Sequence, residues 1–339
     1  MKKTLLMLLS IIMTALLVVG CAGNNQGSET TETNETETTT ETTDEVDVDG
    51  GQDTEFRVAI SLPPADNAWQ AKMRQDLIEA TDLIPDIEFV IVNAVDDNDQ
   101  LNQLNVFRND DFDMIMALPG NGTLLTNILE DIYNSGTKTV IFDRAIDGED
   151  FTAFVAGDNY GGGVLAGHFF GEKLNGEGDI VVMRSIMGIP IDLERYNGFM
   201  DTINEYYPGI NVLVEVDGSF SREVGLEAMT TVLPAFPHID AVFTQDDEAA
   251  LGAMNAIQNA NRTDIQFITG FGGTQTVFEL YEANDPFFLG TASYFPSMGV
   301  DAVEIAVRIL RGESFDKFTT IPSVWVNADN VSEWMAHAY

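Results

Sequence analysis

Apolar positions in residues 56–339 fall into two patterns. Short runs that are apolar throughout, without polar alternation, are typical of strands buried on both faces of a sheet. Ten such runs predict strands: Arg57–Leu62, Glu88–Val92, Met114–Leu118, Thr139–Phe142, Phe154–Ala156, Ile180–Met183, Asn211–Val216, Ala241–Thr244, Gln266–Gly270 and Leu289–Ser293. Between them lie amphipathic stretches of helix length, such as Gln70–Thr81, Leu124–Asn134, Gly163–Leu174, Glu223–Leu233 and Ala249–Asn259. Since five strand–helix units precede residue 158 and five follow it, we expect an α/β fold with two similar lobes, each a doubly wound parallel sheet covered by helices on both faces.

The first twenty residues have the order of a secretory signal peptide. Two lysines precede the apolar run Leu5–Val19, which is too short to span a bilayer comfortably as a helix. The segment Leu17–Cys21 resembles a bacterial lipobox, and Cys21 is the chain's one cysteine. We therefore expect residues 1–20 to be removed and Cys21 to carry a lipid anchor, with an uncleaved anchor or a buried cysteine as the alternatives.

Residues 22–55 have the composition of a spacer. They contain eleven Asp or Glu and ten Thr, with no Lys, Arg or aromatic residue. Such a segment has almost nothing apolar to bury, and its like charges repel, so it is expected to be disordered and extended. We expect residues 21–55 to form an acidic tether between the lipid and the folded body, the alternative being a low-complexity tail without a role.

The charge of the chain excludes several classes of function. Its 339 residues include 55 Asp or Glu against 16 Lys or Arg, a net charge of −39. This acidity repels phosphate backbones and anionic lipid headgroups, so we expect no nucleic-acid partner and no membrane contact except through the lipid. One cysteine and three histidines provide no intrachain disulfide and little material for a metal centre, so we expect no metal.

Motifs for cofactor binding and catalysis are weak. The segment 161–166 has the spacing of a dinucleotide-binding loop, but Asp158 and Asn159 precede it as a helix N-cap would, which favours glycines that permit close helix packing. The chain has no G-x-x-x-x-G-K-[ST], G-x-S-x-G or H-E-x-x-H motif. We expect a protein without cofactor that is not an enzyme, although the carboxylates of Asp143 and Asp246 leave a glycosidase as an alternative.

Seven segments, in order along the chain, resemble the periplasmic sugar-binding proteins of the ribose/galactose-binding family. They are Ala59-Ile60-Ser61, Asn67-Ala68-Trp69-Gln70, Val140-Ile141-Phe142-Asp143-Arg144, Gly157-Asp158-Asn159-Tyr160-Gly161-Gly162, Arg195-Tyr196-Asn197-Gly198-Phe199, Phe220 before Arg222, and the segment from Phe243 to Ala253. The resemblance covers residues 56–325. It implies the type I periplasmic-binding-protein fold, with residues 56–158 plus 295–321 in one lobe, residues 159–294 plus 322–339 in the other, and a hinge of three strands.

The resemblance also implies the ligand-binding residues, which are Ser61, Asn67, Trp69, Gln70, Asp143, Arg144, Arg195, Phe220, Asp246, Phe271 and Tyr294. Their chemistry suits a sugar, because aromatic faces cover its C–H faces and charged groups form strong hydrogen bonds with its hydroxyls. Alternatives are core packing for the tryptophan and a surface ion pair for the Asp143–Arg144 pair. The chain departs from the family at three positions: Asp246 replaces an asparagine, Gly272 an aspartate, and Tyr294 an amide or other polar residue.

The function that this resemblance implies is solute uptake. We expect a monomeric, extracytoplasmic protein, at the cell surface or in the periplasm, that captures a sugar and delivers it to the permease of an ABC importer. The alternative is a sensor that binds a sugar or furanone-type signal and presents its closed form to a membrane chemoreceptor or kinase. The signal peptide and the absence of a basic helix-turn-helix before Phe56 disfavour a transcription repressor of similar fold.

Overall fold

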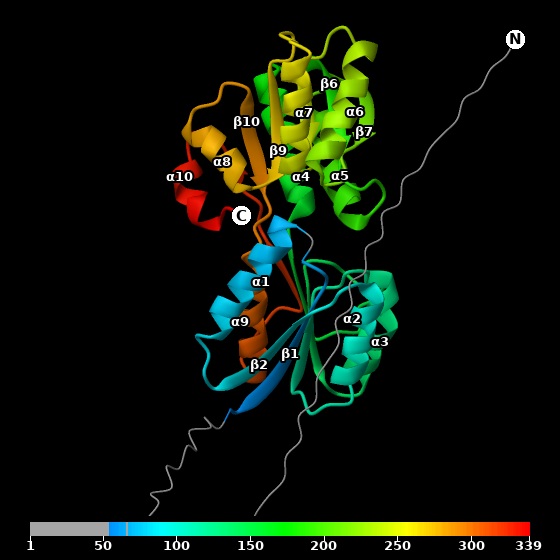
Figure 1. The fold of residues 1–339 in the computed structure, drawn as a ribbon, viewed down its shortest axis with the longest axis vertical. Coiled ribbons are helices and arrows are strands. Elements are labelled where there is room, and N and C mark those ends of the chain that lie inside the picture. The colour runs from blue at the N-terminus through cyan, green and yellow to red at the C-terminus, as the bar shows by residue number, and fades with distance from the viewer. Residues whose placement is uncertain (1–53, 66) are drawn as a thin grey trace, which may run out of the picture. The chain divides into compact units, whose positions relative to one another are not determined.

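The computed structural model describes residues 54–65 and 67–339. The predicted signal peptide and Cys21 therefore lie outside the described residues, as does the predicted tether up to residue 53. The described residues form two six-stranded sheets, each with helices on both faces (Figure 1). None of the helices in this described part is long and apolar enough to cross a membrane.

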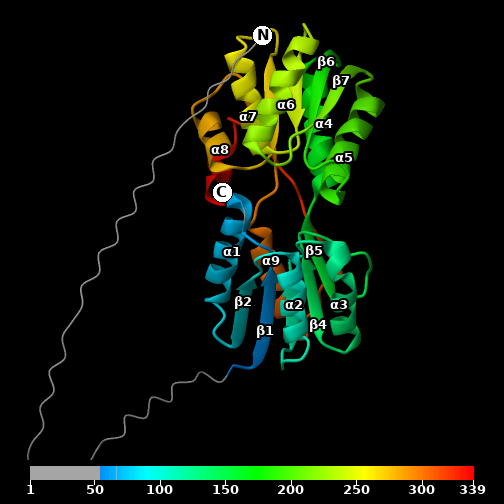
Figure 2. The same ribbon diagram turned by 45° about the vertical axis from the view of Figure 1, so that its right-hand side comes forward.

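The first sheet, called sheet A, has the strand order β11-β5-β4-β3-β1-β2 and is parallel throughout. Its strands are β1 (Phe56–Leu62), β2 (Ile87–Asn93), β3 (Met114–Ala117), β4 (Lys138–Phe142), β5 (Ala153–Gly157) and β11 (Phe318–Ile321). One face carries α1 (Ala68–Thr81) and α9 (Met298–Leu310), and the other carries α2 (Asp97–Phe107) and α3 (Gly122–Asn134) (Figures 1 and 2). Helix α9 thus packs beside α1 although more than 200 residues separate them.

The second sheet, called sheet B, has the order β12-β10-β9-β8-β6-β7. Its strands are β6 (Glu177–Arg184), β7 (Gly209–Asp217), β8 (Ala241–Thr244), β9 (Phe267–Gly272), β10 (Phe288–Ser293) and β12 (Trp325–Val326). Helices α4 (Asn159–Lys173) and α5 (Pro190–Tyr206) cover one face, and α6 (Arg222–Ala235), α7 (Asp247–Asn259) and α8 (Gln275–Glu282) cover the other. The chain ends in α10 (Val331–Trp334) and a 3₁₀ turn (Met335–His337).

The inner strands are continuous apolar runs because they are buried on both faces, whereas the edge strands β2 and β7 are largely exposed or half-buried. In β1, Val58 and Ile60 pack toward α1 and α9, whereas Ala59 packs toward α2 and α3. In β6, Val181 and Ile180 likewise belong to opposite cores. The ten predicted strands correspond to β1–β10, and the expectation of two α/β lobes with parallel sheets is confirmed.

Two strands are absent from the sequence prediction. Strand β11 alternates exposed and half-buried residues at the edge of sheet A, and β12 is only two residues long, so neither forms an apolar run. At the edge of sheet B, the short strand β12 pairs antiparallel with β10, whereas the other strands of this sheet are parallel. Each sheet therefore gains a sixth strand from the last part of the chain.

Three segments connect the two sheets. They lie between β5 and α4, between β10 and α9, and between β11 and β12. The hydroxyl of Ser323 lies 2.9 Å from the carbonyl oxygen of Asp158 and 2.8 Å from that of Ser293, so one side chain contacts all three connections. The lobe boundaries expected from the sequence stay a prediction, which this strand order supports.

Candidate functional site

The carboxyl ends of strands in both sheets carry the candidate residues. In doubly wound sheets this edge, beside the point where the strand order reverses, is where ligands bind. Asp143 follows β4 directly, Asp246 closely follows β8 and Tyr294 follows β10. Arg195 lies in α5, whose first turn begins with Pro190.

The guanidinium of Arg195 lies at the centre of the candidate site. The residue is only 4% exposed. Its Nε donates to Oδ1 of Asn159 at 2.9 Å, and Nη1 donates to the backbone oxygen of Gln245 at 2.7 Å. It forms no ion pair among the described residues, and burial lowers its pKa, opposed by more distant charges such as that of Asp246. The second terminal nitrogen, Nη2, has no hydrogen-bond partner in the described part of the chain and is available to a ligand.

Aromatic rings surround this guanidinium. Its central carbon lies 3.9 Å from the ring centroid of Phe271, 4.8 Å from that of Tyr294 and 6.0 Å from that of Phe220. Cations are attracted to such faces, especially where water is excluded. Phe271 is itself fully buried. A flat guanidinium between aromatic faces is held in one orientation and can bind a planar set of acceptors.

Phe220 owes its position to an unusual loop. Ser219 and Phe220 both have left-handed backbone angles, with φ of 48° and 52°, which cost about 1–2 kcal/mol each for residues other than glycine. Asp217 holds the loop by accepting hydrogen bonds from the backbone nitrogen (2.8 Å) and the hydroxyl (2.7 Å) of Ser219. Backbone strain that the surroundings maintain is common at binding sites.

Asp143, Trp69 and Tyr294 form the other half of the site. The hydroxyl of Tyr294 donates to Oδ1 of Asp143 at 2.7 Å. The indole nitrogen of Trp69 donates to the backbone oxygen of Tyr294 at 2.9 Å, and the two rings are stacked with centroids 6.0 Å apart. Burial raises the pKa of Asp143, opposed chiefly by the charge of Arg144, and burial raises that of Tyr294 well above its ordinary value. Because Asp143 follows a strand of sheet A and Tyr294 follows a strand of sheet B, this cluster joins the two lobes.

Arg144 contacts the same carboxylate from a more exposed position. Its Nε lies 3.5 Å from Oδ2 of Asp143, and its Nη1 donates to the backbone oxygen of Gly120 at 3.2 Å. The backbone nitrogen of Gly120 in turn donates to the side-chain oxygen of Gln100 at 2.8 Å. The predicted alternative of a surface ion pair does not describe Asp143, which is 5% exposed.

Asp246 is the second acidic group of the site. It is the N-cap of α7 and accepts a hydrogen bond from the backbone nitrogen of Ala249 at 3.0 Å. Burial, assisted by the negative charge of Asp247, raises its pKa to about 7. Asp247 itself is fully buried and accepts from Thr291, Gly273 and Thr274, which fixes the loop after β9.

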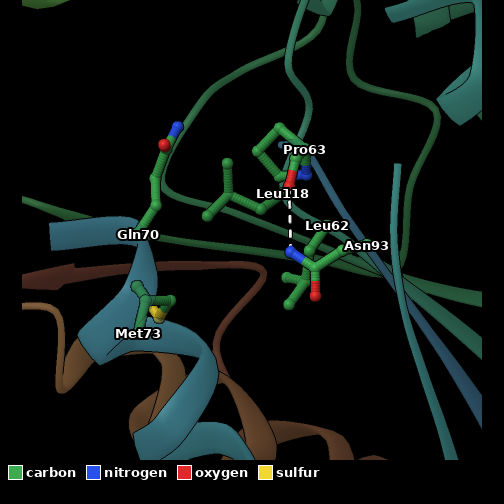
Figure 3. Close-up of a pocket in the computed structure, with 6 residues that line it drawn as sticks. All are labelled: Leu62, Pro63, Gln70, Met73, Asn93 and Leu118. Atoms are coloured by element: carbon green, nitrogen blue, oxygen red, sulfur yellow. Dashed lines mark hydrogen bonds between the residues drawn. The ribbon is translucent and has the colours of Figure 1, made fainter. Parts of the chain in front are cut away.

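Three predicted residues lie away from this cluster. Ser61 is fully buried, and its hydroxyl oxygen lies 3.3 Å from Nε2 of Gln100. Asn67 is exposed and caps α1, accepting from the backbone nitrogen of Gln70 at 2.9 Å. Gln70 lines a small pocket with Leu62, Pro63, Met73, Asn93 and Leu118 (Figure 3). The other eight predicted ligand-binding residues contact one another or, in the case of Asp246, interact with Arg195 through their charges.

Sequence reasoning missed Asn159, Gln245 and Tyr339. The first two orient Arg195 through an amide oxygen and a backbone oxygen, and a single sequence gives no signal for such contacts. Tyr339 lies more than 60 residues beyond β9, yet its phenol oxygen lies against Gly272. The sequence signal for this contact is Gly272 itself, because a glycine leaves space that a side chain from elsewhere in the chain can fill.

The arrangement suits an uncharged polyhydroxyl ligand. The carboxyl groups of Asp143 and Asp246 and the guanidiniums of Arg144 and Arg195 supply hydrogen-bond acceptors and donors, while the rings of Trp69 and Phe220 offer apolar faces. Among the described residues, no group of His, Cys, Asp or Glu side chains has the arrangement to hold a metal ion.

Comparison with known proteins gives a match to one family model. The model of the periplasmic binding protein domain matches residues 58–314. This stretch includes both sheets except for β1's first residues and the edge strands β11 and β12.

Individual relatives agree. The chain is 29% identical over 201 residues to the ribose import binding protein of Salmonella typhimurium, an alignment that covers 59% of this chain and just under two thirds (66%) of that protein. The crystal structure of an ABC transporter solute binding protein from Bacillus halodurans with bound myo-inositol is similar, with a TM-score of 0.76, 26% identity and coverage of 85% of this chain and 99% of that one. The fructose-binding periplasmic domain of a hybrid two-component system has a TM-score of 0.74 at 25% identity, covering 83% and 94%.

Proposed function

Because the chain belongs to the periplasmic binding protein domain family, we propose that it is an extracytoplasmic, lipid-anchored receptor that captures a sugar between its lobes and delivers it to an ABC importer. The observation that carries this proposal is the cluster in which Tyr294 and Arg195 meet Asp143 and Trp69. These side chains come from both lobes, so a ligand among them would contact both.

A sugar is the ligand class that the chemistry favours. The site combines the guanidinium donors of Arg144 and Arg195 with the carboxyl groups of Asp143 and Asp246, and this mixture of donors and acceptors matches the hydroxyls of a sugar, which both donate and accept. Hydroxyl groups can accept from Nη2 of Arg195 and donate to the carboxylates of Asp143 and Asp246. Relatives that bind or import ribose, fructose and myo-inositol support the same class.

Thermal unfolding with a defined panel tests sugar binding. We expect at least one of D-ribose, D-fructose, xylitol and myo-inositol to raise the unfolding temperature, because a ligand at about one hundred times its Kd stabilises the native state by about 2.7 kcal/mol. Arg195→Lys is the matched variant in which the shift should shrink. An unchanged unfolding temperature with this panel and with a wider set of mono- and disaccharides would contradict the proposal.

A sensor is the second candidate. The similarity to the fructose-binding domain of a hybrid two-component system supports it, since a two-component system is a signalling system. Deleting the gene separates the two roles: loss of uptake of the bound radiolabelled sugar indicates transport. Normal uptake with loss of the transcriptional response to that sugar indicates sensing.

The lipid anchor rests on the lipobox-like segment that ends at Cys21. We expect Cys21→Ser to leave the precursor unprocessed or to release the protein into the soluble fraction, since the thiol that carries the lipid is lost. Labelling with a fatty-acid analogue and cell fractionation measure this. A variant that is processed and stays with the membranes like wild type would show that Cys21 is not the anchor.

A further inference from the structure

The carboxyl end of β9 has no side chain of its own. Its last residue, Gly272, has a φ of 139°, which other residues rarely adopt. A Cβ atom built there would collide with the phenol oxygen of Tyr339 and lie 3.4 Å from Oδ2 of Asp247. The phenol of Tyr339 therefore occupies the space that a side chain at position 272 would take.

Tyr339 is fixed in this place by its own backbone and by the segment before it. Its carbonyl oxygen accepts from the backbone nitrogen of Gln275 at 2.8 Å, at the start of α8. The preceding Ala338 is buried in the core of the second lobe. His337 and Trp334 stack on Phe295, with ring centroids 5.2 and 5.8 Å away. These contacts hold the phenol beside the strand end.

The charges around the phenol are those of the candidate site. Burial and the negative charges of Asp247 and Asp246 raise the pKa of Tyr339 well above its ordinary value, while the charge of Arg195 opposes this. The hydroxyl is therefore neutral and able to donate. It has no hydrogen-bond partner among the described residues, so its donor is left for a ligand.

We propose that Tyr339 is a specificity-determining residue of this site, whose hydroxyl binds one hydroxyl group of the ligand from the position left open by Gly272. This inference rests on the proposed sugar binding. A phenol reaching over from a distant segment approaches the ligand from a different direction than a short side chain on β9 would, so it selects for a sugar with a hydroxyl at that point. Sites that hydrogen-bond a hydroxyl discriminate strongly against analogues without it, because the partner is left unpaired.

Calorimetry with wild type and Tyr339→Phe tests the role. The probes are D-ribose, D-fructose, xylitol and myo-inositol, which place their hydroxyls differently. We expect the substitution to weaken binding of the preferred probe about three- to tenfold, the value of one hydrogen bond, and to weaken the others less, so that selectivity falls. The matched control is Tyr206→Phe, a tyrosine that is 57% exposed on α5, which should change no affinity. A purely structural role would lower all affinities by the same factor.

A second measurement tests the placement without any ligand. Gly272→Ala should destabilise the wild-type protein more than it destabilises Tyr339→Ala, because the collision with the phenol is gone in the second background. If the losses of stability caused by Gly272→Ala and Tyr339→Ala simply add in this double-mutant cycle, the placement of the phenol beside Gly272 is overturned. Wild-type binding with the same selectivity in Tyr339→Phe would overturn the role of Tyr339 alone. A wild type that binds neither these probes nor the wider set of mono- and disaccharides would contradict the proposed function, and this role with it.

Discussion

At the scale of single residues, Arg195 shows how the site keeps a charge available. Its direct partners are a neutral amide oxygen, a backbone oxygen and aromatic faces, and the carboxylates of Asp143 and Asp246 act on it only from a distance. If a carboxylate lay directly beside this buried guanidinium, the positive charge would already be paired within the protein. This one keeps both its charge and a free donor for the hydroxyls of a ligand.

Replacing this guanidinium by an ammonium group should impair binding. We expect Arg195→Lys to weaken the affinity for the preferred sugar by more than about tenfold, because lysine lacks the planar fork that bonds Asn159 and Gln245 and faces the ligand. Calorimetry measures this, and Arg311→Lys, at an exposed arginine paired with Asp86, is the control. Equal affinities in both variants and wild type would exclude Arg195 from the site.

Asp246 should make stability depend on pH. Its pKa of about 7 in the folded protein lies above the ordinary value of 3.8, so the folded state retains a proton that the unfolded state loses, and stability falls as the pH rises from about 4 to about 7. An asparagine at this position would keep the helix cap without this proton. We expect the free energy of unfolding of Asp246→Asn, relative to wild type, to rise by about 1–2 kcal/mol over this range.

Urea unfolding at several pH values measures the effect. The control is Asp86→Asn, because the hydrogen bond from Arg311 lowers the pKa of Asp86 and its effect develops at pH values below the ordinary carboxyl range. The two difference curves should therefore change in separate pH windows. A flat difference for Asp246→Asn between about pH 4 and 7 would mean that the carboxylate of Asp246 ionises without cost in the folded protein.

Motif residues that lie next to a strand end could be placed from the sequence, whereas their supports could not. Asp143 and Asp246 each follow an apolar run, so the fold alone brings them to the ligand edge of a parallel sheet. Asn159, Gln245 and Tyr339 enter the site through contacts with residues 36, 50 and 67 positions away. Those contacts depend on how helices pack and on where the last segment folds back, which no local pattern in one sequence specifies.

At the scale of elements, the glycines of α4 set the distance between two helices. Helix α4 packs on α5, and the segment 161–167 contributes four glycines to α4. A Cβ at Gly163 would collide with the backbone oxygen of Arg195 and lie 2.8 Å from the backbone nitrogen of Phe199. The prediction that these glycines permit close packing is therefore confirmed, and the close approach positions the helix that carries Arg195.

Separating these two helices should affect the fold and the site together. We expect Gly163→Ala to destabilise the protein by about 1–3 kcal/mol, as overpacking does, although alanine is the better helix former. Because α5 must move, sugar affinity should fall as well. Gly312→Ala, where the cost comes from a left-handed φ of 72° with open space around it, should lower stability by about 1 kcal/mol and leave affinity unchanged. Unfolding curves and calorimetry distinguish the two, and normal affinity in a destabilised Gly163→Ala would contradict the coupling.

The length and hydrophobicity of each strand decide whether the sequence predicts it. Strands β1–β10 each contain an apolar run, including the short buried strands β3 and β8 and the half-exposed edge strands β2 and β7. Strands β11 and β12 are edge strands of four and two residues, and most of their side chains are exposed or half-buried, so hydrophobicity does not mark them. They form because, after β10, the chain crosses to the first lobe and then returns to the second. This path is set by the fold as a whole and not by local hydrophobicity.

At the scale of the whole molecule, the three connections between the sheets are the natural hinge. Besides the contacts of Ser323, the backbone nitrogen of Asp158 donates to the oxygen of Ile321 at 2.9 Å, and that of Tyr294 donates to the oxygen of Gly272 at 2.7 Å. A few connecting residues can absorb rotation while each lobe keeps its own pair of cores. Tyr294 lies in one of these connections and also contacts Asp143, so the hinge and the site share a residue.

Ligand should therefore draw the lobes together. On the proposed function, one sugar would contact Asp143 and Trp69 on one side and Arg195 and Phe220 on the other only when the lobes are closed, so binding would shift the population toward the closed arrangement. We expect small-angle scattering of protein lacking residues 1–55 to show a smaller radius of gyration with saturating preferred sugar than without it. Arg195→Lys at the same sugar concentration should show a smaller change, because fewer molecules are liganded. A saturated wild type with an unchanged scattering curve would contradict closure and indicate a rigid site, in which the permease or sensor must recognise the ligand-bound protein by some feature other than its shape.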